Sequence, residues 1–74
     1  MGELAAMTYR GEVNPRTLGG WKWAVIQIDD AGIETELVGG ASGEDGPDGY
    51  CWAVDMAYEH LGSFDPEAKV VEPR

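Results

Sequence analysis

Alternation of hydrophobic and polar residues predicts three β-strands in the first half of the chain. Residues 8–13 alternate over a short distance and stop at an Asn-Pro turn signal. Residues 21–28 are rich in β-branched and aromatic side chains, and residues 33–38 alternate at a period of two. A short Asp-Ala-Gly connection separates the last two runs, so we expect them to form a β-hairpin.

The second half of the chain predicts one helix. Residues 39–49 contain five glycines and are expected to form a loop. Asp48 can cap a helix over residues 50–61, and Gly62 is placed to end it. The helical face that would pack on a sheet is apolar and consists of Tyr50, Ala53, Val54, Ala57 and Leu61.

This order of elements predicts an α+β fold, in which one helix packs on one face of a three-stranded antiparallel sheet (β-β-β-α). Residues 69–71 are apolar enough for a short C-terminal edge strand, with a frayed tail as the alternative. The 74 residues are expected to form a single domain, with residues 1–7 and 67–74 as the segments that could fray.

Alternation along the second predicted strand divides its side chains between two faces. Ala24, Ile26 and Ile28 share the face that we expect to meet the helix. Trp21 and Trp23 would then lie on the open face, where large aromatic side chains often anchor protein interfaces. The alternative is that the N-terminal segment or a second copy of the chain covers both tryptophans.

Short motifs resemble the plant apetala-type DNA-binding domain, namely Tyr9-Arg10-Gly11-Glu12-Val13, Trp21-Lys22-Trp23-Ala24 and Ala57-Tyr58-Glu59. The resemblance covers residues 8–60 and implies the same β-β-β-α order. That family reads DNA with arginines on the exposed sheet face, whereas the third predicted strand here carries Glu34 and Glu36. Two carboxylates would repel a phosphate backbone. The resemblance therefore implies a shared fold whose DNA-binding role has been lost or inverted.

The chain is strongly acidic, with 14 Asp and Glu against 5 Lys and Arg and a formal net charge of −9. Clustered Lys and Arg hold nucleic acids and anionic membranes, so direct binding to either is not expected. No Lys or Arg occurs between Trp23 and Ala68, a span with eleven carboxylates. This charge distribution indicates a cationic partner.

The carboxylates are placed regularly on the predicted elements. Glu34 and Glu36 share one face of a strand. Asp48, Asp55 and Glu59 fall on one stripe of the helix, although like charges one turn apart cost a few tenths of a kcal/mol. Predicted turns and loops extend the negative field with Asp29, Asp30, Glu44 and Asp45.

Carboxylates held on a small rigid scaffold can imitate nucleic-acid phosphates and attract the basic groove of a nucleic-acid-binding protein or complex. As a class, this profile resembles the small acidic phage inhibitors of bacterial defence, the anti-CRISPR and anti-restriction proteins. The resemblance implies a DNA mimic that acts in the cytoplasm of a bacterial host. Two alternatives stay open: the acidic surface only keeps a small protein soluble, or a structural protein homodimerises through its open sheet face.

Catalytic, metal and targeting signals are weak. One Cys and one His exclude a Cys/His zinc cage, and Cys51 and His60 fall on opposite sides of the predicted helix. Cys51 is expected to be buried, and His60 to lie at the helix end. The acidic loop 44–49 lacks the spacing of an EF-hand. We therefore expect a non-enzymatic protein without cofactor or metal, and neither a secretory signal nor a membrane-spanning run is found.

Overall fold

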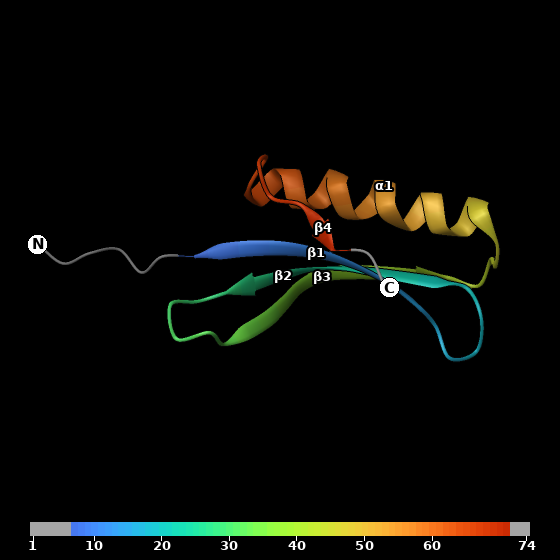
Figure 1. Cartoon of the computed structure of the whole chain (residues 1–74), viewed down its shortest axis with the longest axis horizontal. Coiled ribbons are helices and arrows are strands. Elements are labelled where there is room, and N and C mark those ends of the chain that lie inside the picture. The colour runs from blue at the N-terminus through green and yellow to red at the C-terminus, as the bar shows by residue number, and fades with distance from the viewer. Residues whose placement is uncertain (1–6, 72–74) are drawn as a thin grey trace, which may run out of the picture.

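The computed structural model describes residues 7–71, which form four strands and one helix (Figure 1). The α+β class and the strand-strand-strand-helix order are those that the sequence predicts. Expectations about residues 1–6 and 72–74 lie outside the described residues. The elements are β1 (Thr8–Pro15), β2 (Trp21–Ile28), β3 (Glu34–Ser42), α1 (Pro47–Phe64) and β4 (Val70–Val71).

The sheet is four-stranded and mixed, in the order β3-β2-β1-β4. Strands β1, β2 and β3 are antiparallel neighbours, whereas β4 runs parallel to β1. The prediction of a three-stranded antiparallel sheet is therefore wrong in this detail, and the short edge strand expected near the C-terminus is present as β4. Gly11 leaves room for β4, because a Cβ at that position would lie 2.9 Å from Cγ2 of Val70.

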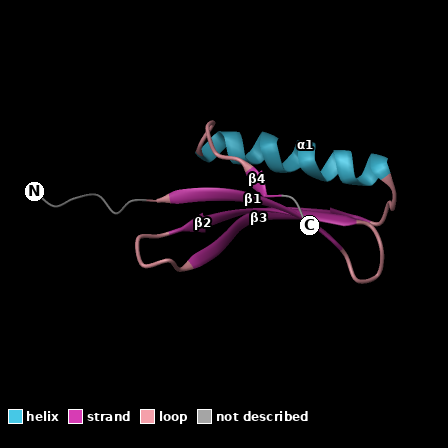
Figure 2. Cartoon of the chain, viewed as in Figure 1, coloured by secondary structure: helices cyan, strands magenta, loops and turns pink. Residues whose placement is uncertain are grey.

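Helix α1 lies across one face of the sheet and leaves the other face open (Figure 2). Val13, Val25 and Leu61 are the largest fully buried side chains between the two layers. The predicted apolar face of the helix is confirmed. It packs on the sheet through the buried Ala53, Ala57 and Leu61 and the partly buried Tyr50 and Val54.

The face of β2 that meets the helix is the opposite of the predicted one. Trp23 is only 5% exposed and belongs to the core cluster with Val25. Trp21 is partly buried against the same cluster, and its ring centroid lies 4.8 Å from that of Tyr50. Trp21 and Trp23 are therefore covered by α1 and do not lie on the open face.

The register between β1 and β2 explains this reversal. Val13 pairs with Trp23, while Arg10 and Glu12 pair with the alternate residues of β2. Paired residues point to the same side of a sheet, so burying the Ala24 side of β2 would also bury the charged side chains of β1. Burying a charged side chain costs free energy unless it is paired with an opposite charge and hydrogen-bonded. The apolar side of β1 thus selects which side of β2 faces the helix.

β3 extends to Ser42, beyond the predicted end at Val38, and includes two glycines assigned to a loop. A Cβ at Gly40 would lie 2.8 Å from Nε1 of Trp23, and a Cβ at Gly39 would lie 2.8 Å from the Trp23 carbonyl oxygen. Neither contact leaves room for a side chain. Gly40 therefore allows β3 to run close to the large indole, and Gly39 allows it to run close to the backbone of β2.

Helix α1 is longer at both ends than predicted. Gly46, with a φ of 91°, takes the N-cap position, and Asp48 lies in the first turn, where its charge suits the helix dipole. The helix continues past Gly62, whose φ is not positive. Near its C-terminal end, the ring of Phe64 stacks on Tyr9 with a centroid separation of 5.5 Å, which holds the last turn against β1.

Replacing Gly40 by alanine should destabilise the fold. The new methyl group would meet the Trp23 indole at 2.8 Å, so either the ring or β3 must move, and overpacking of this kind costs about 1–3 kcal/mol. Urea denaturation followed by tryptophan fluorescence measures the change. Gly62→Ala is the matched control: it lies within α1 with open space around the added Cβ, and should stabilise by about 1 kcal/mol. A stable Gly40→Ala variant would contradict the role given to Gly40.

Candidate functional site

The structure separates the predicted contact residues instead of gathering them. Glu34 and Glu36 lie on the open side of the sheet, because they pair with Ile28 and Ile26. Asp55 and Glu59 are exposed on α1, which covers the other side. The remaining predicted contacts lie elsewhere: Asp29 and Asp30 after β2, Glu44 and Asp45 between β3 and α1, and Trp21 and Trp23 in or against the core.

The core position of the tryptophans removes them from any contact surface on the open face. The Trp23 ring stacks on His60, with centroids 4.7 Å apart and an interplanar angle of 20°. Its Nε1 is buried and has no hydrogen-bond partner in the described part of the chain. A homodimer built on tryptophans of the open face therefore loses its apolar anchor. Cys51, expected to be buried, is exposed.

Two of the predicted contact acids organise the loops that hold them. Oδ1 of Asp29 accepts hydrogen bonds from the backbone N–H groups of Ala31 and Ile33, each at 2.9 Å. Oδ1 of Asp45 accepts from the backbone N–H of Gly20, which ties the β3–α1 loop to the loop before β2. Side chains committed in this way shape the turns, as Asp commonly does.

Arg10 compensates part of the negative charge on the open sheet face. Its Nη2 donates to Oε1 of Glu34 at 2.7 Å, and its Nε donates to Oε2 of Glu12 at 2.8 Å. The hydrogen bond and the positive charge of Arg10 lower the pKa of Glu34. Glu36 is exposed and has no ion pair among residues 7–71. The open face is therefore of mixed charge.

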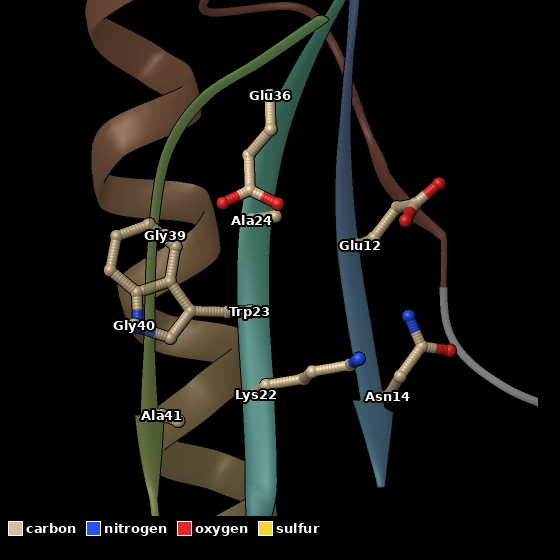
Figure 3. Close-up of a pocket in the computed structure, with 9 residues that line it drawn as sticks. All are labelled: Glu12, Asn14, Lys22, Trp23, Ala24, Glu36, Gly39, Gly40 and Ala41. Atoms are coloured by element: carbon tan, nitrogen blue, oxygen red, sulfur yellow. The ribbon is translucent and has the colours of Figure 1, made fainter. Parts of the chain in front are cut away.

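A depression of about 380 Å³ lies on this open face (Figure 3). Small residues from β2 and β3 line it, including Ala24, Gly39 and Ala41. Its polar lining comes from Glu12, Asn14, Lys22 and Glu36.

Among the described residues, no group of three or more His, Cys, Asp or Glu side chains could hold a metal ion. No described helix has the length and hydrophobicity of one that crosses a bilayer.

The outer side of α1 carries the most uniform charge. Asp48, Asp55 and Glu59 are all exposed, and α1 contains no Lys or Arg. Helix geometry places neighbouring carboxylates of this stripe about 10 and 6 Å apart along the axis. Both ion pairs found among the described residues belong to Arg10, so this stripe is not neutralised within residues 7–71.

Sequence reasoning missed an aromatic residue on the same stripe. Trp52 is 37% exposed and lies four residues after Asp48 and three before Asp55, a spacing that could have revealed it. Tyr58, 44% exposed, borders the stripe. We call Asp48, Trp52, Asp55 and Glu59 the acidic helix face.

No protein-family model matches the chain, and neither a curated protein nor a solved structure matches it significantly. The resemblances to the apetala-type domain and to phage inhibitors are neither supported nor refuted by these comparisons. Function must therefore be inferred from the surfaces of the molecule.

Acidification should weaken the fold through Glu34. The pKa of Glu34 is lowered in the folded chain, so its ionised carboxylate stabilises the fold at pH values above 4.5, the ordinary pKa of Glu. That contribution is lost as the pH falls through the lowered pKa. Urea denaturation from about pH 7 to about pH 3 measures it. Glu34→Gln should be less stable at neutral pH and lose less on acidification, whereas Glu67→Gln should follow the wild type. Parallel losses in wild type and Glu34→Gln would contradict this role.

Glu59→Lys should stabilise the protein. The substitution removes the repulsion between Asp55 and Glu59 and places an opposite charge one turn after Asp55, which together are worth about 0.5–1 kcal/mol. Both positions are exposed, so no buried contact is lost. Thermal and urea denaturation measure the gain, with the loop variant Glu67→Lys as a control of equal charge change. A less stable Glu59→Lys protein would show that Glu59 makes a structural contribution.

Proposed function

We propose that the protein is a non-enzymatic binder whose acidic helix face occupies the basic, nucleic-acid-binding surface of a partner protein. The observation that carries this proposal is the row of Asp48, Asp55 and Glu59, exposed on a helix without any Lys or Arg. A cationic surface is the complement of such a row. Electrostatic attraction of this kind speeds association and makes it sensitive to salt.

The spacing of the carboxylates supports mimicry of a nucleic acid. Their axial separations of about 6 and 10 Å are close to two and three nucleotide steps of about 3.4 Å along one DNA strand. A helix fixes these distances better than a loop, because its rise per residue is regular. A partner that grips phosphates two and three nucleotide steps apart could therefore grip this stripe.

The cost of this arrangement also supports a role in binding. Asp55 and Glu59 are like charges one helical turn apart, which destabilises a helix. Solubility alone requires negative charge but no ordered stripe and no exposed tryptophan. Trp52 adds a residue type that often dominates binding energy at protein interfaces.

The partner class follows from the resemblance to small acidic phage inhibitors. Within this proposal, the protein is a phage-encoded DNA mimic, and its target is a nucleic-acid-binding component of bacterial defence. It acts in the host cytoplasm and carries out no chemistry of its own.

Glu59→Lys tests the proposal, because the variant is expected to be at least as stable as the wild type. Immobilised wild type, Glu59→Lys and Glu67→Lys are compared for proteins retained from nuclease-treated bacterial lysate. Retention of the specific partner should fall about tenfold with Glu59→Lys and stay unchanged with Glu67→Lys. Raising salt from about 50 to about 300 mM should weaken retention by a similar factor.

Competition with DNA completes the test. Added duplex DNA should displace the retained partner, because both ligands use one basic surface. The proposal fails if Glu59→Lys retains the partner as well as Glu67→Lys does, or if saturating DNA leaves the complex intact.

A further inference from the structure

The two edges of the sheet are unequal. One edge is β4, two residues long, whereas the other is β3, nine residues long. In the part of the chain that the structure describes, β3 pairs only with β2, and residues 34–42 make no other hydrogen bond between two backbone groups. The outer side of β3 thus presents unpaired N–H and C=O groups, which form a template for another strand.

β3 has some of the features that usually protect an edge, namely the charged Glu34 and Glu36 and one bulge, but lacks others. It contains no Lys and no Pro. Its one irregularity is a bulge, since Val25 pairs with Val38 while the next residue, Ile26, pairs with Glu36. This leaves Leu37 without a partner on β2, and its side chain is 37% exposed. The regular segment after the bulge, from Val38 to Ser42, remains open.

We propose that the β3 edge binds an extended, basic segment of a partner protein, which adds to the sheet as a fifth strand. Glu34 and Glu36 lie two residues apart and point to the same side. Arg10 already pairs with Glu34, whereas Glu36 has no ion pair among residues 7–71, so a Lys or Arg of the added strand would face Glu36. Strand addition of this type takes affinity from backbone hydrogen bonds and specificity from alternate side chains.

Charge decides between this occupant and a second copy of the chain. Two copies would each carry −9 and would repel one another as they approach. A basic segment would be attracted to the acidic chain instead of repelled by it. Figure 3 shows the Glu36 carboxylate directed over Ala24. It forms no ion pair among residues 7–71 and can therefore pair with a new basic side chain.

This surface is separate from the acidic helix face, and its binding mode goes beyond the proposed function. The helix face recognises charge, whereas the β3 edge also demands an extended backbone with free amide groups. The proposal for the acidic helix face and the proposal for the β3 edge can therefore be tested separately, and either can fail without the other.

A peptide of about eight residues that alternates lysine with valine is the probe. Amide hydrogen exchange and NMR shifts of the full chain are followed as peptide is added. Exchange should slow along residues 34–42, and the same peptide with proline at its centre should not bind. Glu36→Lys should weaken binding about tenfold, since a facing opposite charge becomes a like charge. Glu67→Lys, with an equal charge change, should bind as the wild type does.

Three outcomes would overturn the inference. Equal binding of the proline-containing peptide would show that charge alone is recognised. Shifts confined to α1 would place the peptide on the acidic helix face. Protection of residues 34–42 without peptide, together with a dimer mass in solution, would show that a second copy occupies the edge.

Discussion

Burial of the Trp23 indole between β3 and α1 is the constraint on which the rest of the structure depends. The ring is 5% exposed and stacks on His60, and Gly40 gives it room against β3. A 74-residue chain has a thin core, so one side chain of this size contributes a large share of the buried apolar surface. Its burial goes together with that of the apolar side of β1, because Trp23 pairs with Val13.

The same choice of faces distributes the charge. Once the apolar side of β1 is buried, Arg10 must lie on the open face, where it pairs with Glu12 and Glu34. The outer side of α1 receives no comparable cation, because no Lys or Arg occurs in the helix. The negative field expected over most of the chain is therefore divided: Arg10 compensates part of it on the open face, and no ion pair compensates the helix side within the described residues. This asymmetry gives the acidic helix face its place in the proposed function.

The two proposed forms of recognition can coexist on so small a domain because they use different atoms. The acidic helix face offers side-chain carboxylates. The β3 edge offers backbone groups that the sheet leaves unpaired. Salt weakens the first strongly and the second less, since screening acts on charges more than on hydrogen bonds between strands. A partner with both a basic surface and an extended basic segment would use both.

The sequence by itself determined the local elements: the hairpin of β2 and β3, the apolar stripe of α1, and the carboxylates at positions 55 and 59 that share one helix side. Those features depend on residues close in the chain. Tertiary structure decided the side of β2 that is buried, the parallel pairing of β4 with β1, and the neutralisation of Glu34 by Arg10. Alternation defines two faces of a strand but not which one is covered, because only the register with a distant strand makes that choice.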